Sequence, residues 1–286
     1  MPPSVSCLEE RQWRKRKAAL LQGLARFERL AVAFSGGVDS SVLLHAACLA
    51  LGDRAVGVIA DSPSLPRREL EAARSTAAAL GARLVVLATD ELSDPGYRAN
   101  AGERCYHCKR TLFTAMRAWA QREGVADLAF GEIADDLLDQ RPGRRAAGEA
   151  HVHAPLREAG FGKHDVRRWA GEHALPVADK PASACLASRL PLGTPVTRAR
   201  LARVERAEGA LADLGLRVLR VRDHGRQARV EVGRGELERA RALGPALEQA
   251  LHAAGFLEWE LGLYVPPAER VVPQAPVSAP DQGRPR

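Results

Sequence analysis

Short apolar runs alternate with amphipathic stretches through the first half of the chain. The apolar runs occupy residues 29–34, 54–60, 82–88 and 126–132. Each has the length and the mainly apolar composition that are typical of a strand buried on both faces. The stretches between them, and the basic segment 8–28 before the first run, have helical periodicity. In the third stretch the helix is expected to begin at residue 109, after a loop that contains two cysteines, and the segment 132–163 is expected to form loops. This alternation predicts an α/β fold, with a parallel sheet covered by helices on both faces.

The pattern changes in the last third of the chain. A long helix is predicted for residues 197–215, a β-hairpin for 217–224 and 227–232, and a final strand for 257–264. These elements indicate a small α+β domain. The segment after them is rich in proline and polar residues, which predicts disorder. We therefore expect three parts, which are residues 1–194, 195–264 and 265–286.

Composition narrows the class of protein. The 286 residues are 46% hydrophobic, and no apolar run approaches the roughly 20 residues that cross a bilayer. The N-terminal segment is charged where a signal peptide has an apolar core. Five scattered cysteines do not match a disulfide framework. We expect a cytoplasmic protein that has no membrane partner and whose thiols are free or bind metal.

The net charge of +7 is compatible with RNA or with small phosphorylated ligands, and also with a genome that favours arginine codons. Aromatic residues make up only 5% of the chain and show no stacking pattern. Because binding of single-stranded RNA depends on aromatic stacking, nucleic acid is not the expected partner.

The segment SGGVDS, which begins at Ser35, lies between the first predicted strand and a predicted helix. Gly36 and Gly37 allow backbone N–H groups to turn toward an anion. Ser35 and Ser40 add hydroxyl donors, and the N-terminus of the helix favours negative charge. The GK[ST] ending of a Walker loop is missing. The alternative is an ordinary glycine-rich turn with Asp39 as a helix cap.

This loop resembles the SGGxDS pyrophosphate loop of the N-type ATP pyrophosphatases, or PP-loop enzymes, which split ATP into an adenylate and pyrophosphate. The resemblance implies an adenine nucleotide alpha hydrolase-like domain that uses ATP, with Ser35, Gly36, Gly37, Asp39 and Ser40 around the phosphates. It also implies that Asp39 helps to hold Mg²⁺ on the pyrophosphate.

Two further residues match this family directly after the second predicted strand. Asp61 and Ser62 lie where such enzymes usually bind adenosine. Capping of the helix that follows is an equally good explanation for both residues.

Three cysteines stand close to distinctive segments. Cys105 and Cys108 form a CxxC in RCYHCK, and Cys185 lies in ACLASRLPLGTPVT. A CxxC can be a redox pair, half of a zinc site, part of an iron–sulfur site, or two thiols without function. A zinc site needs further ligands, for which the chain offers His107, His151 and His153.

Four motifs together, SGGVDS, RCYHCK, DDLLDQRPGRRA and ACLASRLPLGTPVT, resemble the LarE family of sulfur transferases, from about residue 10 to about residue 263. The resemblance implies an ATP-dependent sulfurtransferase, forming AMP and pyrophosphate, that adenylates a carboxylate of pyridinium-3,5-biscarboxylic acid mononucleotide and converts it to a thiocarboxylate. This is a step toward the nickel-pincer nucleotide cofactor of lactate racemase. The resemblance also implies a homo-oligomer.

The family donates sulfur in two ways. In one branch a cysteine is sacrificed, and its position here is Ala184, which has no sulfur. The other branch has three cysteines that hold a [4Fe–4S] cluster, and Cys105, Cys108 and Cys185 match them. Three thiolates leave one iron open to carry a sulfide from a donor. The resemblance implies that these cysteines and Asp39 are the catalytic residues.

The resemblance also implies a substrate site. Arg220 and Arg222 are two residues apart on a predicted strand, so they share one face and can clamp the phosphate of the nucleotide substrate. Solvated strand arginines are the alternative. Glu208 matches an acidic position near this site. Arg141 and Arg189 are candidates to neutralise the substrate carboxylate or the leaving AMP.

Other functions remain open from the sequence. One is thiolation of tRNA, because relatives with this loop also use cysteine-bound clusters. Another is a non-catalytic metal-binding PP-loop protein, and a third is ammonia-dependent amidation. Lys109 and Lys180 flank the cysteine segments and can offset the charge of a cluster.

Overall fold

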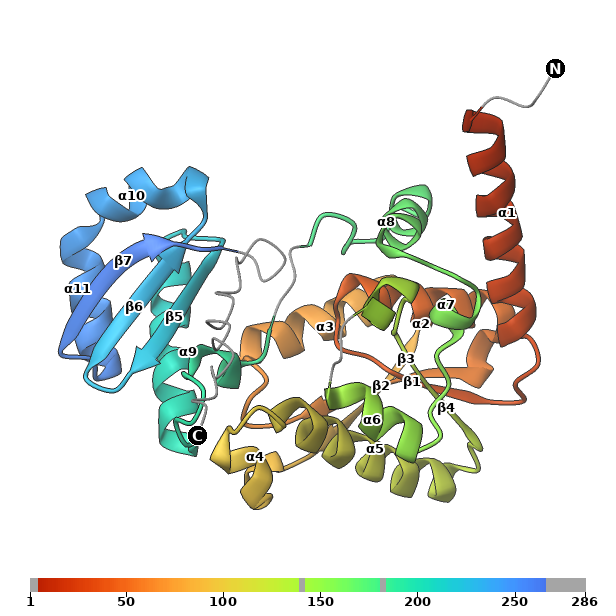
Figure 1. The fold of residues 1–286 in the computed structure, drawn as a ribbon, viewed down its shortest axis with the longest axis horizontal. Coiled ribbons are helices and arrows are strands. Elements are labelled where there is room, and N and C mark those ends of the chain that lie inside the picture. Colours follow the sequence, from red (N-terminus) through yellow and green to blue (C-terminus); the bar gives the residue numbers. More distant parts are fainter. Residues whose placement is uncertain (1–4, 139–141, 181–183, 266–286) are drawn as a thin grey trace, which may run out of the picture. The chain divides into compact units, whose positions relative to one another are not determined.

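The computed structural model describes residues 5–138, 142–180 and 184–265. The chain divides into two compact units, Met1–Glu205 and Arg206–Arg286 (Figure 1). Each unit has its own sheet and its own hydrophobic core. Apart from Val265, the predicted terminal segment 265–286 lies outside the described residues. The predicted division of function among the domains stays a prediction.

The first unit is built on a parallel four-stranded sheet with the order β3-β2-β1-β4. Its strands are β1 (Leu30–Ala33), β2 (Ala55–Asp61), β3 (Arg83–Ala88) and β4 (Asp127–Phe130). β1 pairs in parallel with both β2 and β4, so the chain builds the sheet in opposite directions from β1. The predicted α/β fold is confirmed, and the reversal of strand order marks the sheet edge where such folds bind ligands.

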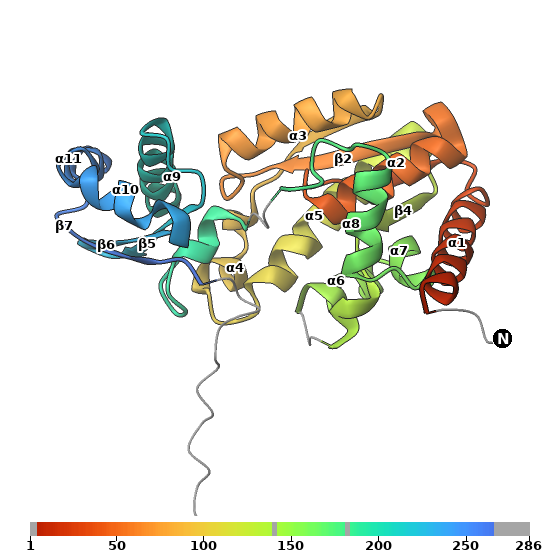
Figure 2. The ribbon, with the colours of Figure 1, turned by 90° about the horizontal axis from the view of Figure 1, so that it is seen from above.

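Helices cover both faces of this sheet (Figures 1 and 2). The longer helices are α1 (Val5–Leu24), α2 (Val38–Leu51), α3 (Arg67–Ala79), α5 (Arg104–Glu123), α6 (Pro142–Glu149), α8 (Lys163–Glu172) and α9 (Arg198–Asp213), which continues into the second unit. The shorter ones are α4 (Pro95–Ala99), α7 (Pro155–Glu158) and the 3-10 helices η1 (Gly52–Arg54), η2 (Glu91–Ser93), η3 (Ala134–Leu138) and η4 (Leu186–Arg189). Within the described residues, no helix combines the length and hydrophobicity that spanning a bilayer requires.

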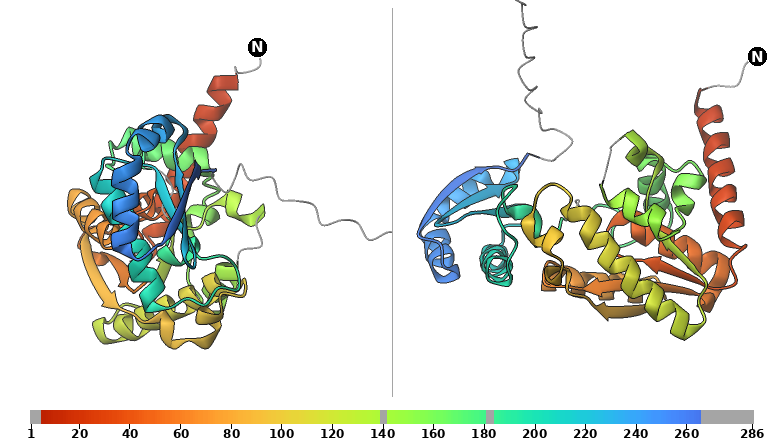
Figure 3. Two further views of the ribbon diagram at one scale, coloured as in Figure 1. Left: turned by 90° about the vertical axis from the view of Figure 1, so that its left-hand side faces the viewer. Right: turned by 60° about the horizontal axis from the view of Figure 1, so that its bottom comes forward.

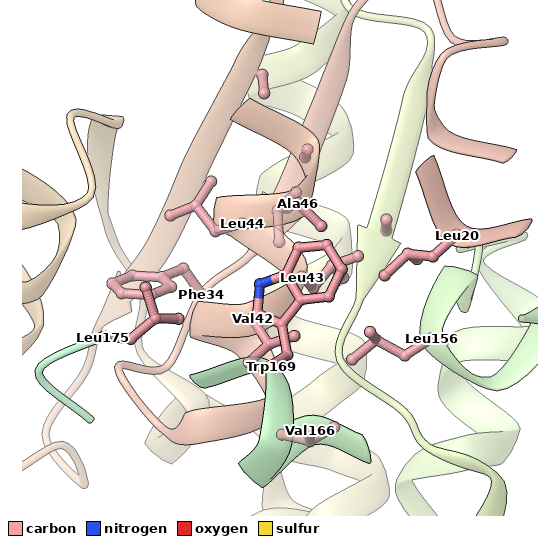
Figure 4. Packing of buried hydrophobic residues seen from close by; sticks show 14 of the residues in the cluster. Leu20, Phe34, Val42, Leu43, Leu44, Ala46, Leu156, Val166, Trp169 and Leu175 are labelled. Carbon is pink, nitrogen blue, oxygen red and sulfur yellow. The ribbon is translucent and has the colours of Figure 1, made fainter. Parts of the chain in front are cut away.

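Alternation along β1 distributes its side chains between two cores. Leu30 and Val32 pack with α1, α2, α3, α7 and α8, whereas Ala31 packs with α5 and α6. This is the period of two that a strand imposes on its side chains. On the first face, the fully buried indole of Trp169 lies beside Val42 and Leu43 of α2 (Figure 4).

Two local features differ from the expected pattern. The helix predicted from residue 109 begins at Arg104, so the CxxC lies in the first turns of α5 and not in a loop. The segment 132–163, expected to form loops, contains η3, α6 and α7. Pro142 and Pro155 occupy the first positions of α6 and α7, where proline favours helix initiation.

The second unit contains a three-stranded sheet with the order β5-β6-β7. β5 (Leu219–His224) and β6 (Gln227–Val232) form the predicted antiparallel hairpin, and β7 (Glu258–Leu263) pairs in parallel with β6. The helical elements η5 (Arg234–Glu236), α10 (Leu237–Ala242) and α11 (Gly244–Ala254) follow β6. Helices gather on one face of the sheet, where one core forms (Figure 3). The predicted α+β character is confirmed.

Two histidines lie against Trp169 in the first unit. The indole Nε1–H of Trp169 donates to Nδ1 of His45 at 3.0 Å, and the rings of His45 and His173 are 4.7 Å apart. Partial burial, followed by the charges of His173 and Lys17, lowers the pKa of His45. Burial, followed by the charge of Lys17, lowers the pKa of His173. Protonation of either ring therefore opposes folding.

We expect the free energy of unfolding to decrease as pH falls below about 6.5, the ordinary pKa of histidine. Below that value the unfolded chain binds more protons than the folded chain, because the folded pKa values are lowered. The variant His45→Asn, whose Oδ1 can still accept from Trp169, should show a weaker pH dependence. Urea unfolding at about pH 7.5 and about pH 5.5 measures the difference. His164→Asn, on exposed surface of α8, is the control. An equal loss of unfolding free energy between the two pH values in wild type and in His45→Asn would contradict this account.

Candidate functional site

The phosphate loop connects β1 to α2, which begins at Val38 with Gly37 as its N-cap. The hydroxyl of Ser40 donates to the carbonyl of Gly37 at 3.0 Å and accepts from the backbone N–H of Ser35 at 3.2 Å. The hydroxyls of Ser35 and Ser40 are 3.1 Å apart. These bonds shape the loop in the protein alone, next to the N-terminus of a fourteen-residue helix, a favourable place for an anion.

Two glycines permit close approaches at this loop. Gly36 has a φ of +68°, and a Cβ atom there would lie 2.9 Å from Cβ of Ala73 in α3. Gly131 follows β4, and its Cβ would lie 2.9 Å from the backbone nitrogen of Ser40. Any larger residue would push α3 or the end of β4 away from the loop.

A cavity of about 200 Å³ lies at the carboxyl ends of β1 and β4. Its lining includes the predicted loop residues, a lysine of α5 and the end of β4, namely Ser35, Gly37, Asp39, Ser40, Lys109 and Phe130. Lys109 Nζ lies 4.7 Å from the centre of the Phe130 ring. Lys109 directly follows the CxxC, so this cavity joins the phosphate loop to the helix that carries two of the cysteines.

A second lysine, from a segment much later in the sequence, contacts the phosphate loop. Lys180 Nζ donates to the carbonyl of Gly36 at 3.0 Å and pairs with Glu69 at 2.8 Å. Lys180 precedes Cys185 by five residues. The segment before the third cysteine is thus tied to the phosphate loop.

Asp61 and Ser62 lie at the end of β2, beside a separate cavity of about 400 Å³. Asp61 pairs with Arg67 at 2.5 Å, and the hydroxyl of Ser62 is 3.2 Å from that of Ser64. Ser62 is buried, whereas Asp61 is partly exposed. Their predicted contact with adenosine stays a prediction.

The three predicted cluster cysteines come from two segments. Cys105 and Cys108 lie in the first turns of α5, and Cys185 is the N-cap of η4. Cys108 and Cys185 pack against one apolar cluster that includes Leu92 and Tyr97. Burial, followed by the proximity of Cys185, raises the pKa of the Cys108 thiol. Burial raises the pKa of the Cys185 thiol. The fold thus gathers thiols that the sequence separates widely.

The side chains near the cysteines can be compared with the ligands that a zinc ion or an iron–sulfur cluster requires. Among the described residues, no three His, Cys, Asp or Glu side chains converge on a position for one metal ion. His107 pairs with Asp94 at 2.7 Å and His153 with Asp127 at 3.2 Å, and the zinc alternative stays open. Thiolates of a cluster bind separate irons and need not share one ion. Cys105 lies near enough to affect the pKa of both Cys108 and Cys185, which pack on one apolar cluster, so the three thiols are compatible with binding separate irons of one cluster.

Two residues for which the sequence predicts no role, Arg104 and Glu91, lie near Cys108. Arg104 donates to Oδ1 of Asn100 at 2.7 Å and to the carbonyl of Ala187 at 2.8 Å, and so links α5 to the Cys185 segment. Glu91 is 2% exposed and accepts a hydrogen bond from the Ser64 hydroxyl. A position next to the CxxC was the one available signal for Arg104, because its partners are brought near by folding.

Two of the predicted substrate-binding arginines, Arg141 and Arg189, belong to the sequence of this unit. Arg189 is 2% exposed and donates to the carbonyls of Ala184 at 2.6 Å and Cys185 at 2.9 Å. It holds the backbone around the third cysteine, and its predicted contact with substrate stays a prediction. Arg141 lies outside the described residues.

The remaining predicted substrate residues belong to the second unit. Arg220 and Arg222 share one face of β5, as the strand period requires. Arg222 pairs with Glu231 at 2.8 Å, and the Arg220 guanidinium lies 5.1 Å from the centre of the Tyr264 ring. Oε1 of Glu208 accepts the backbone N–H of Val221 at 2.9 Å. Their predicted roles in phosphate binding stay predictions.

Comparison with known proteins shows similarity over most of the chain. The chain is 35% identical over 242 residues to the pyridinium-3,5-bisthiocarboxylic acid mononucleotide synthase of Lactiplantibacillus plantarum, covering 84% of this chain and 88% of that protein. It is 40% identical over 213 residues to an uncharacterized protein, slr1717, of Synechocystis, covering 74% and 80%.

A shorter stretch of the chain is also similar to a protein of another name. An argininosuccinate synthase of Halobacterium salinarum is 36% identical over 161 residues, which cover 52% of this chain and 40% of that protein. None of the known protein-family models matches the sequence. The similarities over most of the chain confirm the predicted resemblance to an enzyme family that transfers sulfur. The chain belongs to the LarE-like family of pyridinium-3,5-bisthiocarboxylic acid mononucleotide synthases.

Proposed function

We propose that this enzyme uses ATP to adenylate a carboxylate of pyridinium-3,5-biscarboxylic acid mononucleotide and then converts that carboxylate to a thiocarboxylate. One observation carries the proposal. Lys109, next to the CxxC, lines the same cavity as the phosphate loop, so ATP chemistry and thiol chemistry can take place at adjoining sites. The function named for the relative in Lactiplantibacillus plantarum agrees with this chemistry.

In the first half-reaction, a carboxylate oxygen attacks the α-phosphorus of ATP and pyrophosphate leaves. The N-terminus of α2 and the hydroxyls of Ser35 and Ser40 would hold the leaving pyrophosphate through its oxygens. Lys109 lines the cavity and would balance part of the negative charge of the pyrophosphate. Mg²⁺ bound through Asp39 would neutralise more of that charge.

In the second half-reaction, sulfur replaces AMP on the activated carboxyl carbon. Cys105, Cys108 and Cys185 would hold a [4Fe–4S] cluster, which when bound supplies a sulfur that is not part of the protein. Arg104 would keep α5 and the Cys185 segment together through its two hydrogen bonds. Ala184 offers no sulfur at the position of a sacrificial cysteine. A sulfide donor and homo-oligomeric assembly belong to the same proposal.

The two half-reactions can be separated by substitution. In anaerobically purified wild type we expect about four irons per chain, absorption near 400 nm and formation of thiocarboxylate from substrate and ATP. Cys105→Ser should lose iron and thiocarboxylate but keep substrate-dependent release of pyrophosphate, because the phosphate loop does not include that thiol. Metal analysis, a pyrophosphate assay and mass spectrometry of the product measure these three quantities.

Cys48→Ala is the control for this experiment, because Cys48 is a free thiol of α2 outside the cysteine site. It should retain iron and both half-reactions. Stoichiometric zinc without iron, or full thiocarboxylate formation by Cys105→Ser, would contradict the proposed sulfur chemistry. Absence of substrate-dependent pyrophosphate from wild type would contradict adenylation itself.

A second prediction concerns the shape of the phosphate loop. Gly36→Ala should reduce pyrophosphate release at least about tenfold, because a left-handed alanine costs about 1–2 kcal/mol and its Cβ also meets Ala73. Steady-state kinetics measure the loss. Gly23→Ala is the control, because a Cβ there would have no neighbour within 4 Å. Unchanged activity of Gly36→Ala would show that the loop need not keep this conformation.

A third prediction concerns the link between the cysteine segments. Arg104→Met removes the two hydrogen bonds that join α5 to Asn100 and Ala187, so the cluster should lose iron to a chelator faster than in wild type. Chelator absorbance over time gives the rate. Arg117→Met is matched to it, since Arg117 is also on α5 and donates to two carbonyls, those of Ala126 and Ala150. Equal rates in the two variants would exclude a special role for Arg104.

A further inference from the structure

A third cavity, of about 600 Å³, lies beside the phosphate-loop cavity, because Phe130 lines both. It is bordered by the end of β4, the start of α5 and α6, which lies along α5 (Figure 1). Among the residues that the structure describes, its charged lining consists of Glu103, Glu132, Arg144, Arg145 and Arg157. The proposed binding of pyrophosphate involves none of these side chains.

The two acidic side chains of this cavity are already engaged by arginines. Oε2 of Glu132 is 2.5 Å from Arg157, and Oε1 of Glu132 is 3.6 Å from Arg144. Glu132 is 5% exposed, so its charge is held inside the protein. Glu103 pairs with Arg145 at 2.6 Å. Arg145 also lies 3.7 Å from Glu149, so its charge is compensated, whereas Arg144 and Arg157 share one glutamate.

The excess of positive over negative charge lies at Arg144 and Arg157. Arg144 and Arg157 share the single carboxylate of Glu132, and their side chains are 34% and 32% exposed. A guanidinium has five N–H donors, so two of them exceed what one carboxylate can accept. The longer contact, that of Arg144, leaves its guanidinium the better placed to bind a further anion.

The cavity adjoins both parts of the site. Phe130 lines this cavity and the phosphate-loop cavity. At Gly143 of α6, a Cβ atom would lie 2.8 Å from Cδ of Lys109 and 3.4 Å from the carbonyl oxygen of Cys105. The wall of the cavity is therefore packed directly on the helix that carries the CxxC.

The lining also suits a flat ring. Phe130, Val152 and Ala147 contribute apolar surface next to the arginines. Ligand sites commonly combine such a surface with a few polar groups that set orientation. A ring that lies against Phe130 would border the phosphate-loop cavity on one side and the cavity that Arg144 lines on the other.

We propose that Arg144, supported by Arg157, binds the second carboxylate of the acid that is adenylated, and so selects dicarboxylic acids. The inference rests on the proposed function, since it concerns the substrate of the same site. Arg144 and Arg157 carry two positive charges against the one negative charge of Glu132, so one further carboxylate balances this group. A phosphate monoester carries about −1.5 to −2 charges at neutral pH and would be left unbalanced.

The test is direct binding of small probes to the full chain. By titration calorimetry, wild type should bind pyridine-3,5-dicarboxylate about ten- to a hundredfold more tightly than pyridine-3-carboxylate, the range for a hydrogen bond to a charged group. Arg144→Gln should abolish that preference, and Arg144→Lys should restore part of it. Arg74→Gln is the control, because Arg74 is exposed and has a similarly long ion pair, 3.5 Å to Glu71.

Equal binding of the two probes by wild type, or a preference that survives in Arg144→Gln, would overturn the proposal. Inorganic phosphate that displaces the dicarboxylate, with an affinity that depends on Arg144, would assign the subsite to phosphate and also overturn it.

The inference and the proposed function can fail separately. Pyrophosphate release that responds to dicarboxylate, with the same KM in wild type and Arg144→Gln, would reject the subsite and keep adenylation. An Arg144-dependent preference for the dicarboxylate without any pyrophosphate release would keep the subsite and reject adenylation.

Discussion

The close approach of the end of β4 to the first turn of α2 is the constraint on which the site depends. Gly131 allows it, because a Cβ atom there would lie 2.9 Å from the backbone nitrogen of Ser40. The approach closes the phosphate-loop cavity between β1 and β4 and brings Phe130 beside Lys109. Phe130 is also a wall of the neighbouring arginine-lined cavity. Two potential subsites therefore depend on one backbone contact.

Near this contact, the charged side chains that are buried have ion-pair or hydrogen-bond partners. Buried Glu132 is compensated by Arg157 at 2.5 Å, because an unpaired carboxylate inside the protein would be costly. Buried Arg189 uses its donors on backbone carbonyls of the cysteine segment. Lys180 does the same on the phosphate loop, at Gly36. Arginine and lysine here hold backbone segments in place as well as offering charge to ligands.

The order of elements was predictable because it depends on local pattern. Apolar runs, helical periodicity and the glycine pair predict the parallel sheet, the small α+β unit and the phosphate loop. The local pattern failed where packing decided. The start of α5 at Arg104 and the eight-residue helix α6 pack against each other, and so short a helix depends on such packing for its stability.

The sequence by itself determined the fold class, the family motifs and which cysteines could act together. Only the tertiary structure decided what surrounds those cysteines. Arg104 reaches a carbonyl 83 residues further along the chain, and Ser64 reaches Glu91 across 27 residues. The charge pattern of Glu132 with Arg144 and Arg157 arises in the same way. Contacts between distant segments leave no periodic signal in a sequence, because they depend on how whole elements pack and not on the spacing of neighbours.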